Sequence, residues 1–333
     1  MKTTKRSVLA LVCSICLVGA GVAGLPGANA QEVDTLNLSY PESNAYYWNL
    51  GVARDKGFFS DEGFKVNYVT SGATPQIIQM LISGDLNLVT PQPDALFVAI
   101  ARGGKDLRIF AQPALSPDWI LVGKKGLKDI KEAKGLHLGV SALGGSEQTL
   151  AQQVLAEHGL KKGDYNVIVS GLTPTKYAAL QTGSIALAVL YQPTAQLALQ
   201  QGFPDLYRFT KYQPVYPPSY YVVNQKWAAE KDRGKRVSRV IARAHEWLWD
   251  PKNRDEAIKI LQKYTKRDAA LLGEIYDQYF VKDKLYSPDG KVRLTGVQTI
   301  LDALIERGDL KKGQLTPDQI VLPAEIGGLI TPQ

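Results

Sequence analysis

Short runs of hydrophobic residues alternate with longer amphipathic segments along the chain. The runs lie at residues 36–40, 66–69, 86–89, 107–111, 136–140, 167–169 and 185–190. Their lengths are those of buried β-strands, and the segments between them repeat apolar residues with the period of an α-helix. Alternation of strand and helix is typical of α/β layers with mostly parallel sheets. We therefore predict an α/β fold.

Two segments, residues 75–93 and 174–193, repeat one arrangement of helix, glycine, strand, loop and helix. Pro75 and Pro174 suit the first helical position, where the missing N–H would have no partner anyway. Gly84 and Gly183 suit the turn that follows each helix. Such units also arise by chance, so coincidence stays open beside pseudo-symmetry. Because the order of the features matches throughout, the repeat favours two related lobes.

Residues 1–30 have the pattern of a secretory signal peptide. Basic residues come first, an apolar run follows at 8–18, and small residues lead to Ala30. We expect cleavage after Ala30 and a mature protein that is periplasmic or otherwise exported. A membrane-spanning helix is the alternative, but glycines and a proline interrupt the run, which is shorter than the roughly 20 residues a bilayer requires.

Both cysteines, Cys13 and Cys16, lie within this segment. The mature chain would then have no thiol, no disulfide and no cysteine ligand for a metal. Val12 and Ile15 precede the cysteines, where lipid attachment would normally need a small residue. We therefore expect a mature protein without a lipid anchor.

The charge of the chain is mildly positive. Without the three basic residues of segment 1–30, it has 36 basic and 32 acidic residues. This balance gives no reason to expect nucleic acid as a partner, because nucleic-acid-binding proteins concentrate positive charge far more heavily. The densest basic stretch, residues 233–243, places Arg236, Arg239 and Arg243 on one face of a helix. A solvated face and a docking surface for an acidic partner both remain open.

Several strand-to-helix loops have the chemistry of a ligand site. In open α/β sheets, ligands bind beyond the carboxyl ends of the strands, where helices begin. Glycine allows the backbone to approach a ligand, and a hydroxyl residue or proline at the helix start leaves main-chain N–H groups directed outward. From these loops we predict ligand contacts by Ser71, Gly72, Ala73, Thr74, Gly144, Gly145, Ser146 and Thr173.

The chain resembles the periplasmic binding proteins of the sulfonate, nitrate and taurine uptake class, which also includes the thiamine-pyrimidine precursor binders. The resemblance spans residues 33–223 and rests on segments 57–66, 71–73, 82–86, 127–140 and 179–183, and on Pro193. It implies a type II periplasmic binding protein, with two Rossmann-like lobes joined by crossover strands near 119–122 and 220–223. Lobe one would comprise residues 33–118 and 220–333, and lobe two residues 119–219.

The same resemblance implies a function. The protein would be a monomer that captures a small-molecule ligand and delivers it to the membrane permease of an ABC transporter. An enzyme on the same scaffold is the alternative, since a related pyrimidine synthase uses a cysteine-rich iron site with a histidine and a lysine. That site has no counterpart in this sequence, and His137, His158 and His245 are isolated from one another. We therefore expect no catalytic residue, no metal and no cofactor.

Aromatic and neutral polar residues dominate the remaining candidate ligand contacts. We predict that Asn44, Tyr46, Gln92, Trp119, Tyr191 and Gln192 also line the site. Tyr46 and Tyr191 follow corresponding strands and would approach from opposite lobes. Because the loops carry few fixed charges, a charged ligand would depend on helix N-termini. We expect a small planar, heterocyclic or sulfonate-like organic ligand in preference to a bare inorganic anion.

Overall fold

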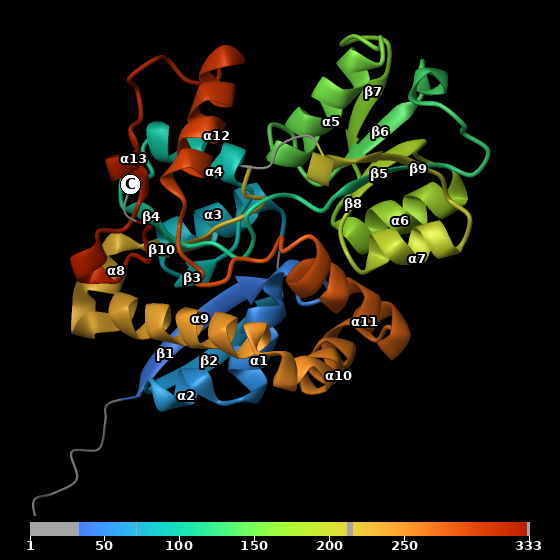
Figure 1. Cartoon of the computed structure of the whole chain (residues 1–333). Coiled ribbons are helices and arrows are strands. Elements are labelled where there is room, and N and C mark those ends of the chain that lie inside the picture. The colour runs from blue at the N-terminus through green and yellow to red at the C-terminus, as the bar shows by residue number, and fades with distance from the viewer. Residues whose placement is uncertain (1–32, 71, 212–215, 332–333) are drawn as a thin grey trace, which may run out of the picture. The chain divides into compact units, whose positions relative to one another are not determined.

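The computed structural model describes residues 33–70, 72–211 and 216–331 (Figure 1). The predicted signal peptide and Ser71 lie outside these residues. The described residues form an α/β fold with two mixed five-stranded sheets, so the predicted fold class is confirmed. In the same residues, no helix has both the length and the apolar character needed to cross a membrane.

The first sheet has the strand order β2-β1-β3-β10-β4. Its strands are β1 (Asp34–Tyr40), β2 (Phe64–Thr70), β3 (Leu88–Val89), β4 (Leu107–Ala111) and β10 (Tyr221–Asn224). Strand β1 is parallel to β2 and β3, whereas β10 is antiparallel to β3 and β4. The helices of this part of the chain include α1 (Trp48–Asp55), α2 (Phe58–Asp61), α3 (Thr74–Ser83), α4 (Pro93–Ala101) and α8 (Gln225–Ala229).

The second sheet repeats this plan with the order β7-β6-β8-β5-β9. Its strands are β5 (Ile120–Gly123), β6 (His137–Val140), β7 (Asn166–Val169), β8 (Leu187–Leu190) and β9 (Asp205–Arg208). Strand β6 is parallel to β7 and β8, and β5 is antiparallel to β8 and β9. Its helices are α5 (Ser146–Glu157), α6 (Thr173–Thr182) and α7 (Thr194–Gln200).

The correspondence between the sheets explains the repeat in the sequence. In each sheet four strands run parallel to one another and one strand is antiparallel to them, in equivalent places. The antiparallel strands, β5 and β10, are the segments where the chain passes from one sheet to the other, after β4 and after β9. Residues 75–93 and 174–193 contain α3 with β3 and α6 with β8, which are equivalent units.

Helices make up most of the C-terminal part. They are α9 (Arg233–Trp249), α10 (Arg254–Thr265), α11 (Ala269–Tyr276), α12 (Leu294–Glu306) and α13 (Pro317–Ile320), with a π-helical turn at Asp277–Lys282. Helix α1 packs against α9 and α10, α12 packs against α4, and α13 packs against β4. This part of the chain therefore completes the structure around the first sheet.

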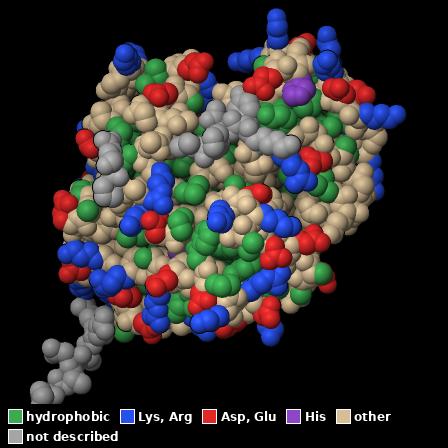
Figure 2. All heavy atoms as spheres, viewed as in Figure 1, with side chains coloured by type: hydrophobic (Ala, Val, Ile, Leu, Met, Phe, Trp, Pro, Cys, Tyr) green, Lys and Arg blue, Asp and Glu red, His purple; other side chains and the backbone are tan. Residues whose placement is uncertain are grey.

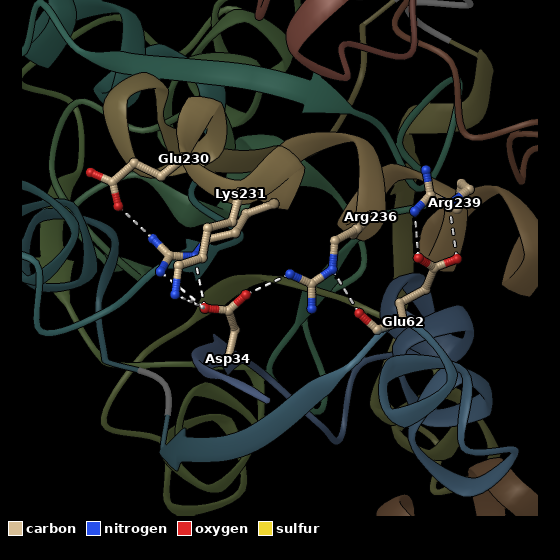
Figure 3. A network of polar contacts seen from close by, with 7 residues as sticks. Asp34, Glu62, Glu230, Lys231, Arg236 and Arg239 are labelled. Carbon is tan, nitrogen blue, oxygen red and sulfur yellow. Dashed lines mark hydrogen bonds and ion pairs between the residues drawn. The ribbon is translucent and has the colours of Figure 1, made fainter. Parts of the chain in front are cut away.

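The arginines of α9 are paired with acidic residues of the same chain (Figure 3). Arg236 contacts Asp34 at the start of β1 and donates to the Glu62 carbonyl at 2.7 Å. Arg239 pairs with Glu62 at 2.6 Å, and Arg243 pairs with Asp61 at 2.7 Å. Neither interpretation of this face from the sequence foresaw these pairs, which join α9 to the β1–α2–β2 unit. Figure 2 shows basic and acidic side chains interspersed over the face in view, in keeping with the mild net charge.

Candidate functional site

Loops from both sheets enclose a small hollow, which we call the inner pocket. Its volume is about 70 Å³. The first sheet contributes the loops after β1, β2 and β3 and a residue just before β10, and the second sheet contributes the loops after β6, β7 and β8. The lining residues are Pro41, Ser43, Asn44, Tyr47, Gly72, Thr74, Ile77, Thr90, Gln92, Ser141, Leu172, Thr173, Pro174, Tyr191, Gln192, Thr194 and Pro218. The pocket therefore lies at the carboxyl ends of parallel strands, where α/β proteins bind ligands.

The predicted ligand residues divide into three groups in the structure. Those that line the inner pocket are Asn44, Gly72, Thr74, Gln92, Thr173, Tyr191 and Gln192. Those that lie outside its lining are Tyr46, Ala73, Trp119, Gly144, Gly145 and Ser146. Ser71 is outside the described residues. Ligand contact remains a prediction for each of them.

Four buried side-chain oxygens of the lining have no hydrogen-bond partner within the described chain. They are Thr90 Oγ1, Gln92 Oε1, Ser141 Oγ and Thr173 Oγ1. Leaving a buried polar group without a partner costs about 1–3 kcal/mol. A ligand with hydrogen-bonding groups would satisfy the three hydroxyls. Sequence analysis did not select Thr90 or Ser141 as ligand contacts, because an unpaired hydroxyl is visible only after the loops are assembled.

Three of the helices that begin at the inner pocket, α3, α4 and α6, have no side-chain cap. Their N-caps are Ala73 for α3, Gln92 for α4 and Leu172 for α6, and none of these side chains accepts a hydrogen bond from its helix. The uncapped N-terminus of a helix carries partial positive charge and favours an acceptor or an anion. The lining residues include no Asp, Glu, Lys, Arg or His. Helix ends are therefore the main source of positive potential at the pocket wall.

A buried ion pair supports the wall of the pocket. Lys176 and Glu147 are fully buried and in contact, and Lys176 Nζ also donates to the Val189 carbonyl at 2.6 Å. Glu147 Oε2 accepts from the Ser141 N–H at 3.1 Å and from Gln92 Nε2 at 3.3 Å. Burial holds the pKa of Lys176 well below its ordinary value. This pair therefore positions Gln92 and Ser141, two residues of the lining.

Tyr191 is held in place by a hydrogen bond from Gln92 and by packing against Trp119 and Tyr46. Gln92 Nε2 donates to the Tyr191 hydroxyl at 3.0 Å. The Tyr191 ring meets Trp119 edge-on with centroids 5.1 Å apart and Tyr46 with centroids 6.2 Å apart. Trp119 and Tyr46 are almost completely buried. Of the three aromatic residues, Tyr191 alone belongs to the described lining, and the other two hold its ring in place.

A second buried carboxylate joins helices from both halves of the structure. Asp94 of α4 contacts Ser146 and accepts from Thr149 Oγ1 at 3.0 Å, and both hydroxyl residues belong to α5. It also accepts from the Tyr216 hydroxyl at 2.6 Å and from Arg307 Nη1 at 2.9 Å. We call these five residues the Asp94 cluster. The cluster holds the start of α5 against the start of α4.

Gly145 lies where the start of α5 approaches the start of α4. A Cβ atom at this position would collide with Gln92 Oε1. A larger residue at this position would therefore displace the Gln92 amide from its place at the pocket wall. Gly145 and Ser146 thus act at the contact between the helices, next to the inner pocket.

The histidines have no common site. His245 is buried, and its Nδ1 lies 2.7 Å from the Ser287 carbonyl, to which it donates. Burial lowers the pKa of His245 to about 4, so the ring is neutral at physiological pH. Within the described residues, no cluster of three or more His, Cys, Asp or Glu side chains could hold a metal ion.

Comparison with known proteins identifies the family. Residues 44–254 match the model of the NMT1/THI5-like family, and the chain belongs to this family. A curated relative is YtlA of Bacillus subtilis (strain 168), whose name describes it as a binding protein. It is 23% identical over 276 residues, which cover 80% of this chain and 81% of YtlA.

Solved structures confirm the fold as that of type II periplasmic binding proteins. The nitrate-binding protein NrtA of Synechocystis PCC 6803 superposes with a TM-score of 0.76 at 15% identity, over 90% of this chain and 92% of NrtA. The alkanesulfonate-binding protein SsuA of Xanthomonas axonopodis pv. citri, bound to MOPS, has a TM-score of 0.68 at 18% identity, over 90% of this chain and 99% of SsuA.

Proposed function

We propose that this protein is the extracytoplasmic ligand-binding component of an ABC-type importer. Two lobes, formed by residues 33–118 with 220–333 and by residues 119–219, would close around a small organic molecule and present it to a membrane permease. Residues 1–30 would direct export and be removed. Membership of the NMT1/THI5-like family and the two equivalent sheets support this proposal.

The observation that carries the proposal is the set of unpaired hydroxyls of Thr90, Ser141 and Thr173 in the inner pocket. Thr90 follows a strand of the first sheet, whereas Ser141 and Thr173 follow strands of the second. A ligand bonded to all three would bridge the two lobes. Such a ligand binds the closed arrangement more tightly than an open one, and that difference in affinity drives closure.

The charges around the inner pocket favour a ligand that is neutral or carries one negative charge. The lining residues are uncharged, and the supporting pair of Lys176 and Glu147 has no net charge when both are ionised. The uncapped starts of α3, α4 and α6 can stabilise one acceptor or anionic group. A ligand with several charges would have no counter-charge in the lining.

We propose binding without chemistry, and the contacts of two potentially reactive side chains support this proposal. Lys176, whose Nζ lies 5.2 Å from the centroid of the Tyr191 ring, is held by Glu147 and by the Val189 carbonyl. His245 is hydrogen-bonded to Ser287 and lies outside the lining. We therefore propose that the ligand leaves the protein unchanged, which mass analysis of candidate metabolites before and after incubation tests.

Native mass spectrometry of protein purified without denaturation tests the proposal. We expect one small-molecule adduct on the wild type and a weaker or absent adduct on Thr173→Val. Loss of a hydroxyl contact should cost about 1–2 kcal/mol, roughly 5- to 30-fold in Kd. Thr182→Val, at the exposed end of the same helix, is the matched control. A bare mass for the wild type, combined with no thermal shift in a metabolite library, would contradict the proposal.

A further inference from the structure

We propose a second ligand subsite next to the inner pocket, which takes a neutral flat conjugated ring attached to the polar head of the ligand. This inference rests on the proposed function and specifies the ligand class. The subsite, which we call the outer pocket, has a volume of about 530 Å³. Its walls include Tyr40, Glu42, Arg54, Tyr68 and Tyr264.

The two pockets adjoin. Pro41, Ser43, Leu172 and Pro174 line both of them. Pro41 and Ser43 follow β1 of the first sheet, and Leu172 and Pro174 lie at the start of α6 beside the second sheet. A ligand whose head lies in the inner pocket would reach the outer pocket by passing between these residues.

The sizes of the pockets decide which part of the ligand lies in each. The inner pocket measures about 70 Å³. An apolar cavity of about 150 Å³ holds one benzene molecule, so the inner pocket is too small for a six-membered ring. It accommodates a compact polar head, whereas the outer pocket has room for the ring.

The outer walls present flat surfaces. The Arg54 guanidinium lies 3.8 Å from the centroid of the Tyr68 ring and 5.3 Å from that of Tyr264. Tyr40 meets Tyr68 edge-on with centroids 6.3 Å apart. Aromatic rings and a guanidinium plane make their best contacts with another flat conjugated group.

The charge of the outer pocket excludes a second anionic group as its preferred occupant. Arg54 Nη1 lies 2.7 Å from Glu42 Oε1, so the cation is already neutralised. An anion would have to displace Glu42, whereas a neutral ring can pack against the tyrosine rings and the partly exposed Arg54 side chain with the ion pair intact. The outer pocket therefore selects a neutral ring.

Matched pairs of probes test this inference. The pairs are acetamide with benzamide, acetate with benzoate, and methanesulfonate with benzenesulfonate, titrated by protein-observed NMR. For each head that binds, the phenyl member should bind at least about 10-fold more tightly than the methyl member. Arg54→Ala should reduce that gain to about 3-fold or less, because one face of the ring loses its contact.

Arg243→Ala is the matched control for Arg54→Ala. The Arg243 guanidinium also stacks on an aromatic ring, at 3.9 Å from Phe58, and pairs with Asp61 at 2.7 Å, but it lies outside both pockets. This control should keep the full gain of the phenyl members. Equal affinities within every pair, or the same gain in Arg54→Ala, would overturn the outer pocket and leave binding in the inner pocket standing. If none of the probes binds, this inference is overturned. The proposed function is overturned only if, in addition, native mass spectrometry of the wild type shows a bare mass and the metabolite library gives no thermal shift.

Discussion

The buried pair of Lys176 and Glu147 should dominate the stability of the second half of the structure. Both side chains are completely buried. Replacing one partner leaves an uncompensated charge in a low-dielectric interior, whereas replacing both removes the charges together. We therefore consider Lys176→Met, Glu147→Gln and the double variant as a thermodynamic cycle.

The structure gives the magnitudes. Lys176→Met leaves the Glu147 carboxylate with the Ser141 N–H and the Gln92 amide as its remaining donors, and should lower the free energy of unfolding by about 3–5 kcal/mol. Glu147→Gln should lower the free energy of unfolding by a similar amount at pH 7. The double variant should recover to within about 2 kcal/mol of the wild type, so the coupling energy should be at least about 3 kcal/mol.

The pH dependence provides a second signature. Because burial lowers the pKa of Lys176, the unfolded chain binds more protons than the folded Glu147→Gln variant at neutral and mildly alkaline pH. Stability rises with pH wherever the unfolded state binds more protons, so this variant should become more stable between pH 7 and pH 9. Urea denaturation of all four proteins at both pH values is the assay. Single variants within about 1 kcal/mol of the wild type would refute the assignment of a buried charged pair.

Three further outcomes are expected. Burial raises the pKa of Asp118 from 3.8 to about 6, so this carboxyl lowers the stability of the protein as the pH rises through that range. In thermal melts, Asp118→Asn should therefore be more stable than the wild type by about 1–3 kcal/mol at pH 7.5 and no different near pH 4. Asp94→Asn should lower the free energy of unfolding, measured by urea denaturation, by about 2–4 kcal/mol because it weakens the contact with Arg307. Asp309 is an exposed partner of the same arginine, so Asp309→Asn should lower that free energy by less than about 1 kcal/mol. Treatment with a chelator should leave the native mass of the liganded protein unchanged, and a lost adduct that one metal restores would contradict this expectation.

The strands could be predicted from the sequence where they are hydrophobic and central. The runs at 36–40 and 107–111 became β1 and β4, which are largely buried. Strand β9 was missed because it lies at the edge of its sheet, and its sequence, Asp-Leu-Tyr-Arg, mixes charged and apolar residues on a partly exposed surface. Strand β3 is shorter than the predicted 86–89, since Leu88–Val89 alone pairs with its neighbours.

Part of the candidate site could also be predicted, because topology brings the carboxyl ends of parallel strands together. Asn44, Gln92 and Thr173 follow such strands and line the inner pocket. Tyr46 and Trp119 lie outside this lining and pack against the Tyr191 ring, because aromatic residues pack against one another as readily as against a ligand; ligand contact by these two stays a prediction. That distinction depends on contacts between distant segments.

The buried charges could not be recognised from the sequence. Asp94, Glu147 and Lys176 occupy the first turns of helices, where charged residues usually face solvent. They are buried because α4 meets α5 and because α6 packs against β8. Such contacts form only when the two sheets and their helices assemble.

A crystal structure of the natively purified protein with its retained ligand tests the central claim most directly. We predict density for a compact polar head in the inner pocket, within hydrogen-bonding distance of Thr90, Ser141 and Thr173, which extends between Pro41 and Pro174 as a flat ring. The ligand would then contact loops of both sheets. Density confined to one half of the structure, or located away from these hydroxyls, would contradict the account.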